Sequence, residues 1–225
     1  MTPIATRFHS EMRIDIYSDV ICPWCYLGDR RFAEALQRVG IDAGVVRYRA
    51  FQLDPTATRE PSDLRRALEA KYGPGSFDSM THRLTALGED AGIDYRFDLA
   101  LRVSTADAHR VIAWAATQPP GQRPIVERLF HAYFTDGSNI ADHDVLTSLA
   151  AQAGYDDEAV ASMLSSGGFT AEVAADLASA RESGISGVPA FVINDQFLIS
   201  GAQDTETFVR LLSRILEREP GTAPA

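Results

Sequence analysis

The sequence predicts an α/β fold in which one sheet is built from two halves separated by a large all-helical insertion. A strand, a helix and a second strand follow one another within residues 13–58. Residues 59–183 then carry helical patterns with no convincing strand, and residues 184–218 return to two strands and a helix. We therefore expect domain boundaries after residues 58 and 183, with flexible termini at 1–12 and 219–225.

The N-terminal half has the pattern of a βαβ unit. Residues 13–19 alternate Ile14 and Ile16 with polar neighbours, which is the period of a strand. A helix with apolar residues at i, i+3, i+4 and i+7 follows and ends at Gly40. A second strand is expected at residues 45–53. If the two strands are parallel, their crossover is right-handed.

Helix starts in the insertion are marked by capping residues or by a proline. Serine, threonine and aspartate side chains accept the free N–H groups of a first turn, and proline suits the first helical position. The expected starts lie at Ser62, Ser76, Ser104 or Thr105, Pro124 and Asp142. No stretch repeats at a fixed period, so a solenoid is excluded.

The C-terminal half has the pattern of a hairpin followed by a helix. Residues 189–194 and 197–201 are apolar runs flanking a short turn, which is typical of an antiparallel pair. A final amphipathic helix is expected from Asp204.

Charge and hydropathy exclude several function classes. The 225 residues include 21 basic and 31 acidic side chains, giving a net charge of −10. This balance argues against a nucleic-acid partner, because affinity for a phosphate backbone comes largely from basic side chains. No apolar run approaches the roughly 18 residues of a membrane span, and the first twelve residues lack the apolar core of a signal peptide. We therefore expect a soluble, cytoplasmic protein with no membrane partner.

The pair Cys22 and Cys25 is the most informative chemical signal in the chain. It lies where the first strand meets the first helix, so Cys22 falls at the helix N-terminus. Free N–H groups and the helix dipole stabilise a thiolate there. Pro23 fits the first helical turn because its missing N–H would have had no partner. We expect Cys22 to be the attacking nucleophile and Cys25, one turn deeper, to be the resolving thiol.

Other roles for the two cysteines fit the sequence less well. A structural zinc site normally needs four ligands, and the chain has no second cysteine pair. Its five histidines show no close pairing in sequence. Two inert buried thiols would not require a position at a strand–helix junction, which is the arrangement of redox pairs. We expect no metal and no bound cofactor.

The run SDVICPWCYLG from Ser18 to Gly28 resembles the DsbA-like thioredoxin-fold oxidoreductases, specifically their FrnE-like branch. The similarity covers residues 13–218. It continues in FQLDP at 51–55, AHR at 108–110, LFHAYF at 129–134, GISGVPAFVI at 184–193 and ISGAQ at 199–203. The resemblance implies a thioredoxin-like fold interrupted by a helical domain.

The resemblance further implies that the Val188–Pro189 bond is cis and that its loop faces the redox pair. A cis proline exposes the preceding backbone, which can then pair with an extended substrate segment. Pro23, Trp24, Val188 and Pro189 are therefore the expected substrate-contacting residues. Family members with histidine in the dipeptide have an additional cation beside the thiolate, whereas this chain has Trp24 at that position.

Two further polar residues are candidates for secondary roles. Asp19, three residues before Cys22, is a candidate proton acceptor, although bonding to the loop backbone is the interpretation we favour. His109 matches an Ala-His element of the family and is a weaker candidate for substrate contact. The Asn-Thr pair that usually precedes this element is replaced by Ser104 and Thr105, which removes any contact made by that asparagine.

The sequence thus favours a thiol–disulfide oxidoreductase acting on protein or small-molecule thiols and disulfides, with glutathione as a possible co-substrate. Two alternatives remain open. The first is a glutathione-dependent isomerase or transferase of the kappa-class or hydroxychromene-carboxylate isomerase type. Those relatives usually have serine where this chain has Cys22. The second is a non-enzymatic thiol redox sensor.

Overall fold

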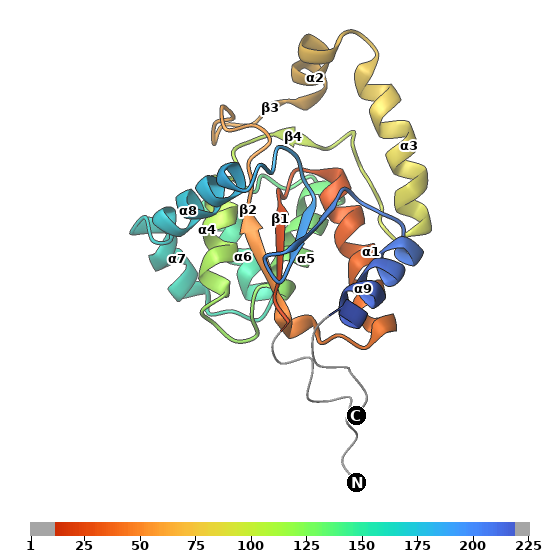
Figure 1. The fold of residues 1–225 in the computed structure, drawn as a ribbon. Coiled ribbons are helices and arrows are strands. Elements are labelled where there is room, and N and C mark those ends of the chain that lie inside the picture. The colour runs from red at the N-terminus through yellow and green to blue at the C-terminus, as the bar shows by residue number, and fades with distance from the viewer. Residues whose placement is uncertain (1–11, 219–225) are drawn as a thin grey trace, which may run out of the picture.

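A computed structural model describes residues 12–218 of the chain (Figure 1). Residues 1–11 and 219–225, where we expected flexible termini, lie outside the described part. The sequence predicts that Met12 belongs to the flexible N-terminal segment, and this prediction is wrong. Its side chain is 6% exposed and belongs to the hydrophobic core.

The order of elements is strand–helix–strand, a series of helices, and strand–strand–helix, as the sequence predicts. The elements are β1 (Ile14–Ser18), α1 (Pro23–Val39), the short 3₁₀ helix η2 (Ala43–Val45), β2 (Val46–Ala50), β3 (Ser62–Asp63), α2 (Leu64–Tyr72), α3 (Ser76–Asp90), β4 (Leu101–Arg102), α4 (Ala106–Ala115), α5 (Arg123–Phe134), α6 (His143–Gln152), α7 (Asp157–Ser165), α8 (Thr170–Glu182), β5 (Ala190–Ile193), β6 (Phe197–Ser200) and α9 (Thr205–Arg218).

The two halves of the chain build one sheet with the strand order β2-β1-β5-β6. β1 and β2 are parallel, which confirms the predicted βαβ unit. β5 pairs antiparallel with both β1 and β6, which confirms the predicted hairpin. Asn194 and Asp195 at its turn have φ angles of 52° and 56°. Positive φ at both central residues matches the twist of the strands that they connect.

The start of the insertion differs from the prediction in detail. Ser62 pairs with Arg102 in the short strands β3 and β4, so the expectation of a strand-free insertion is wrong here. Two-residue strands are too short to show a period in the sequence. Asp63, not Ser62, caps α2 by accepting the Arg66 N–H at 2.9 Å. Ser76 is the first residue of α3, and Gly75 precedes it.

One face of the sheet is covered by α1 and α9. Phe32 of α1, Phe191 of β5 and Phe208 of α9 form an aromatic cluster with ring centroids 4.5–5.0 Å apart. All three side chains are at most 1% exposed. Burial of this size supplies much of the free energy that fixes the helices on the sheet. The start of α1 is thereby held beside the C-terminal end of β1, an inner strand of the sheet.

The opposite face of β1 is covered by α8 through polar contacts. Asp15 of β1 pairs with Arg49 of β2 at 2.7 Å, and Arg49 also pairs with Asp176 of α8 at 2.7 Å. Nearby, the hydroxyl groups of Tyr17 and Ser179 lie 2.9 Å apart. Every residue of β1 is buried as a result. The polar positions of its alternating pattern meet the insertion, not solvent.

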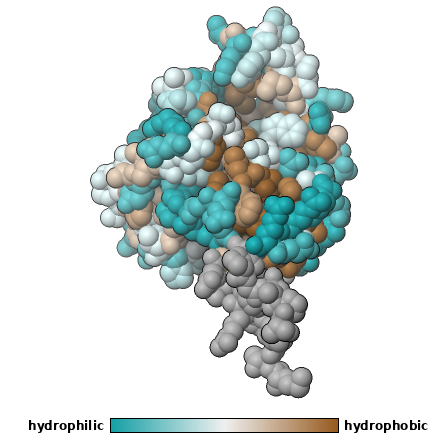
Figure 2. Space-filling model, viewed as in Figure 1, coloured by the Kyte–Doolittle hydropathy of each residue, from teal (hydrophilic) through white to brown (hydrophobic). Residues whose placement is uncertain are grey.

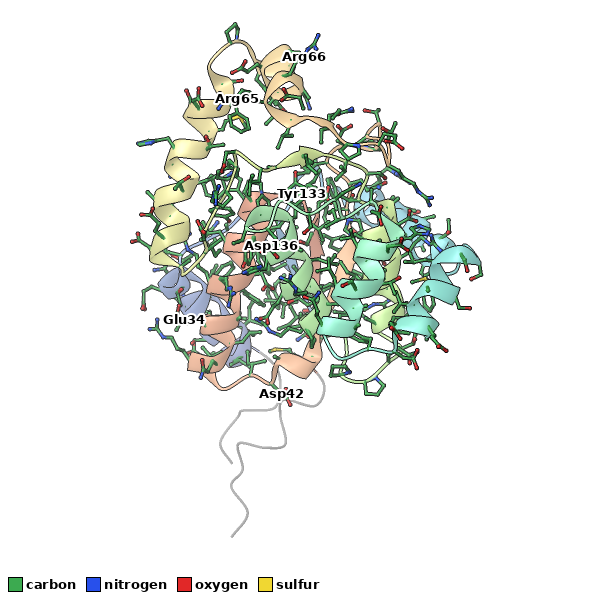
Figure 3. The ribbon with its side chains drawn as sticks, turned by 180° about the vertical axis from the view of Figure 1, so that it is seen from behind. Glu34, Asp42, Arg65, Arg66, Tyr133 and Asp136 are labelled. Carbon is green, nitrogen blue, oxygen red and sulfur yellow. The ribbon has the colours of Figure 1, made fainter. Side chains whose placement is uncertain are left out.

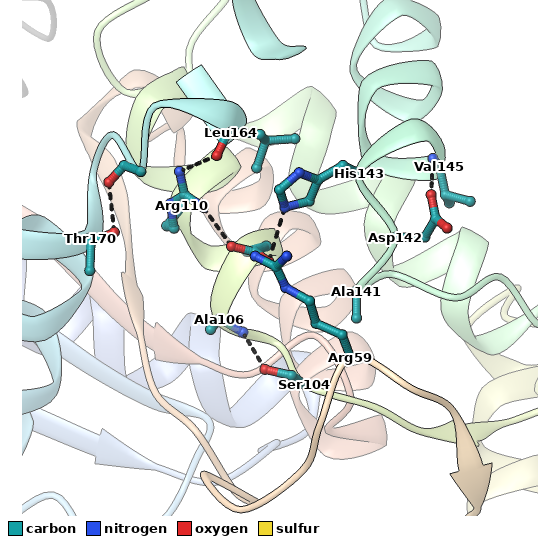
Figure 4. Close-up of polar contacts among 12 residues, drawn as sticks. Arg59, Ser104, Ala106, Arg110, Ala141, Asp142, His143, Val145, Leu164 and Thr170 are labelled. Atoms are coloured by element: carbon teal, nitrogen blue, oxygen red, sulfur yellow. Dashed lines mark hydrogen bonds and ion pairs between the residues drawn. The ribbon is translucent and has the colours of Figure 1, made fainter. Parts of the chain in front are cut away.

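An ion network ties several helices of the insertion together (Figure 4). Asp107 on α4 is paired with Arg110 at 2.6 Å, with Arg59 at 2.6 Å and with His143 at 3.2 Å. Arg110 also donates to the carbonyl groups of Met163, Leu164 and Gly168 around the end of α7. The carbonyl groups of Met163 and Leu164 belong to the last turn of α7, where no N–H group of the helix can reach them.

The helices α2 and α3 project from the body as an arm, which is drawn at the top of Figure 1. No residue of α2 is buried, whereas α3 packs against α1. Figure 2 shows hydrophobic surface over the middle of this face and again beneath the arm. No helix within residues 12–218 combines the length and the hydropathy needed to cross a bilayer.

Candidate active site

The Cys22-Pro23-Trp24-Cys25 motif occupies the first turn of α1, as the sequence predicts. Cys22 has extended backbone angles and is the N-cap residue, and Pro23 is the first helical residue. The Cys22 carbonyl accepts the N–H groups of Cys25 and Tyr26 at 3.0 and 3.2 Å. The side chain of Cys22 therefore lies where the uncompensated N–H groups of the helix concentrate positive potential.

The loop before β5 faces this turn. The Val188–Pro189 bond is cis, and the Cys22 thiol donates a long hydrogen bond of 3.7 Å to the Val188 carbonyl. The expected cis geometry and the expected proximity of this loop to the redox pair are both confirmed. Two residues 166 positions apart in sequence are thus in contact at the Cys22 sulfur.

A glycine in α1 permits this close approach. A Cβ atom placed on Gly28 would lie 3.0 Å from Pro189 Cγ and 3.3 Å from Ala202 Cβ. Most real Cβ contacts are longer than that, so a side chain here would push the proline loop away from α1. Gly28 lies in the motif that carries the family resemblance, but its spatial role is visible only in the structure.

Both cysteines are free and buried, with 3% of Cys22 and 1% of Cys25 exposed. Burial, together with the adjacent Cys22, raises the pKa of the Cys25 thiol well above the value of a free cysteine. Cys25 is therefore held as a neutral thiol at neutral pH. The nearby side chains that reach the surface are half-buried: Ile21, Pro23, Trp24 and Val188.

Asp19 lies beneath the motif and connects it to the insertion. Its backbone carbonyl accepts the Cys22 N–H at 2.9 Å, and its carboxylate accepts the Leu53 N–H at 2.8 Å. The other carboxylate oxygen lies 3.2 Å from Nε2 of His109 on α4. Asp19 is fully buried and His109 is 3% exposed. The structure therefore places His109 behind the redox loop and not on the surface, where substrate contact was expected.

Tyr95 is a site residue that the sequence analysis did not find. Its hydroxyl group donates to the Pro23 carbonyl at 2.6 Å, and its ring packs edge-on against Tyr26. Burial raises the pKa of Tyr95 above its ordinary value, so the hydroxyl group remains a donor at neutral pH. Pro23 and Tyr95 are 72 residues apart, and no local pattern connects them.

Within residues 12–218, no group of three or more histidine, cysteine, aspartate or glutamate side chains is arranged to hold a metal ion. The reactive side chains that the loop before β5 faces are the two thiols of Cys22 and Cys25. They lie one helical turn apart, next to a loop that presents a backbone carbonyl.

Comparison with known proteins places this geometry among thioredoxin-like folds. The family model described as a DSBA-like thioredoxin domain matches residues 13–213. A probable DsbA oxidoreductase from Streptomyces coelicolor, SCO1869, is 31% identical in sequence. The match covers 95% of this chain and 94% of that one, with a TM-score of 0.84.

Two solved structures with lower sequence identity share the fold. The cytosolic disulfide reductase DsbM from Pseudomonas aeruginosa is 20% identical, and the match covers 91% of this chain and 98% of that one, with a TM-score of 0.65. DsbM has also been solved with GSH. A 2-hydroxychromene-2-carboxylate isomerase is 19% identical, with 94% and 99% of the two chains covered and a TM-score of 0.70.

Proposed function

Because the chain belongs to the DsbA-like thioredoxin family, we propose that it is a thiol–disulfide oxidoreductase with Cys22 as nucleophile and Cys25 as resolving thiol. The observation that carries the proposal is the position of Cys22, at the N-terminus of α1 and 3.7 Å from the Val188 carbonyl. The extended backbone of a substrate can bond beside Val188 while its sulfur meets Cys22.

The exchange proceeds in two displacements. The Cys22 thiolate attacks one sulfur of a substrate disulfide, and the other sulfur leaves with the electron pair of the broken S–S bond. Cys25 then loses its proton and attacks Cys22 Sγ, which releases the second substrate sulfur as a thiolate. The two thiol protons end on the two released thiols. The substrate is thereby reduced and the Cys22–Cys25 pair is oxidised; the reverse sequence oxidises a dithiol.

Asp19 and His109 serve this reaction as positioning residues. The Asp19 backbone bonds to the Cys22 N–H, and its carboxylate fixes the neighbouring Leu53 segment. His109 holds that carboxylate from the insertion side. Neither side chain is exposed, so their influence on a substrate passes through the redox loop.

Glutathione is the small thiol that we propose as co-substrate, and the cytosol is the compartment that we propose. The support is the likeness to a cytosolic disulfide reductase that has been solved with GSH. The acidic composition, with a net charge of −10, is compatible with a protein that has no nucleic-acid partner.

A glutathione-dependent isomerase is the second candidate, and its support is the likeness to the 2-hydroxychromene-2-carboxylate isomerase. An isomerase needs one group that activates a glutathione thiol, and a resolving thiol has no part in that chemistry. The intact Cys22–Cys25 pair therefore favours disulfide exchange.

Trapping experiments with the two single-cysteine variants test the proposal. In Cys25→Ser the nucleophile remains, but the thiol that would resolve the mixed disulfide is absent. Mixed disulfides with glutathione should therefore accumulate. Mass spectrometry detects them, and a reductant should reverse them. Cys22→Ser should accumulate far fewer, because Cys25 is more deeply buried and its pKa is raised.

Other outcomes separate the rival functions. Equal trapping by the two variants would mean that the attacking sulfur is misassigned. An absence of trapping in either variant, with oxidised glutathione present, would contradict disulfide exchange altogether. Full activity of Cys25→Ser on a chromene substrate, without an adduct, would establish the isomerase. Redox-dependent binding of a partner, without turnover of any disulfide, would favour a sensor.

A further inference from the structure

The arm is anchored to the redox motif by its second helix. A Cβ atom on Gly88 of α3 would lie 2.4 Å from the ring of Tyr95, so only glycine lets this ring pack against the helix. The hydroxyl group of the same tyrosine bonds to the Pro23 carbonyl. The position of α3 relative to the Cys22 turn is therefore fixed by packing and by one partly buried hydrogen bond.

Arg83 on α3 lies over the side chain of Trp24. Its guanidinium carbon is 5.9 Å from the centroid of the indole ring, which is within the range of a cation–π contact. Trp24 is half-buried and lies two residues after Cys22. The arm thus supplies a cation beside the redox motif, although the dipeptide between the cysteines contains none.

Arg83 has no carboxylate partner among the described residues, although the chain has ten more acidic than basic side chains. The positions three and four residues away on α3 are Ser79, Met80, Ala86 and Leu87, so no helical ion pair can form. Arg65 on α2, by comparison, pairs with Asp78 at 2.8 Å.

The contact with Trp24 leaves the donors of Arg83 available, because the guanidinium group forms no hydrogen bond or ion pair with another described residue. A guanidinium group presents its N–H groups in a planar fork. Those N–H groups match the two oxygens of a carboxylate. A thiol substrate that carries a carboxylate can therefore bond to Arg83 while its sulfur is at Cys22.

We infer that Arg83 and Trp24 form a subsite for the carboxylate of a glutathione-type thiol bound at Cys22. This inference rests on the proposed function and names the substrate class that the site selects. In the first displacement Cys22 joins one glutathionyl sulfur of glutathione disulfide, and the other glutathione leaves as thiolate with the electron pair. Arg83 holds a carboxylate of the bound glutathionyl group, and Cys25 then releases that group as a second thiolate.

The test compares two disulfides on the wild-type protein and on variants of Arg83 and Arg66. Glutathione disulfide carries carboxylates, whereas bis(2-hydroxyethyl) disulfide carries none, and the ratio of their kcat/KM values measures the selectivity. The variants are Arg83→Gln and, as control, Arg66→Gln. Arg66 lies at the far end of the same arm, is exposed and forms no ion pair among the described residues (Figure 3).

We expect the selectivity ratio to fall about tenfold in Arg83→Gln, the effect of losing one charge-assisted hydrogen bond. In Arg66→Gln it should change by less than about twofold, because an exposed charge acts weakly over distance. Arg83→Lys should fall between them, since it keeps the charge but loses the planar fork. The dissociation constant of S-methylglutathione, measured by calorimetry, should rise about tenfold in Arg83→Gln.

The proposed subsite would be contradicted if the selectivity ratio of the two disulfides were unchanged in Arg83→Gln, or if it fell equally in Arg66→Gln. Failure of the wild-type protein to exchange either disulfide would contradict the proposed function instead. The two failures are therefore distinguishable.

Discussion

The Cys25 thiol lies one helical turn after Cys22 with 1% of its surface exposed. Ionisation would place a negative charge in a region without water, and the neighbouring Cys22 adds to that cost, so the pKa of Cys25 is raised. In the resting dithiol, therefore, Cys25 keeps its proton. In the exchange that we propose, Cys25 becomes the attacking thiol after Cys22 has formed a mixed disulfide.

We predict that in Cys22→Ser the alkylation of Cys25 by iodoacetamide has a pH midpoint above the free-thiol value of about 8.5. We expect this upward shift because burial is the largest cause of the raised pKa of Cys25, and burial persists when Cys22 is replaced. The midpoint is obtained from alkylation rates between pH 6 and 10, with unfolded protein in urea as reference. A midpoint at or below that of the unfolded reference would contradict burial as the cause.

The residues of the site differ in how far the sequence could predict them. The position of Cys22 and Cys25 at the start of a helix follows from the local sequence, whereas the cis bond before Pro189 was predicted from the family resemblance. The structure shows both features. Tyr95 and Arg83 reach the motif from the insertion, through contacts over more than fifty residues that leave no local pattern. Such residues become visible only when the arm is folded against α1.

For strand β1, the sequence predicts the element itself but not what covers its polar face. Its alternation of apolar and polar residues predicts a strand correctly, but alternation alone suggests one face in water. In the structure, α8 covers the polar face through Arg49, which pairs with both Asp15 and Asp176. The side chain of Arg49 is 19% exposed, and those of the two aspartates are at most 8% exposed.

Replacing Arg49 by alanine should destabilise the protein by about 3 kcal/mol, because two buried carboxylates lose their common partner. Arg47→Ala is the matched control: it lies two residues earlier in β2, is exposed and forms no ion pair among the described residues. Its effect should stay within about 0.5 kcal/mol. Urea denaturation at pH 7 measures both values. A similar effect of the two substitutions would mean that the ion pairs of Arg49 with Asp15 and Asp176 contribute little to stability.

At the scale of the whole molecule, the sequence predicts a helical insertion with boundaries at residues 58 and 183. The structure contains the insertion, but one hydrophobic cluster runs through it and through both halves of the sheet. Phe130 of α5 stacks on Tyr26 of α1 with ring centroids 4.9 Å apart. Hydrophobic periodicity identifies which face of a helix is apolar, but not which element it will meet. The sequence pattern therefore could not predict that the insertion and the sheet share one core.

A shared core predicts that the insertion and the sheet unfold together. The chain has two tryptophans, Trp24 at the redox motif and Trp114 in α4 of the insertion. Each can be observed alone by fluorescence, in Trp114→Phe and in Trp24→Phe respectively. Within each variant we expect the fluorescence midpoint in urea to coincide with the midpoint of far-UV circular dichroism, because neither part can lose its packing while the other keeps it. Comparison within one variant removes any effect of the substitution on stability. A Trp24 transition that precedes the loss of helix would show that the sheet can unfold while the insertion stays folded, and the shared cluster would then not couple them.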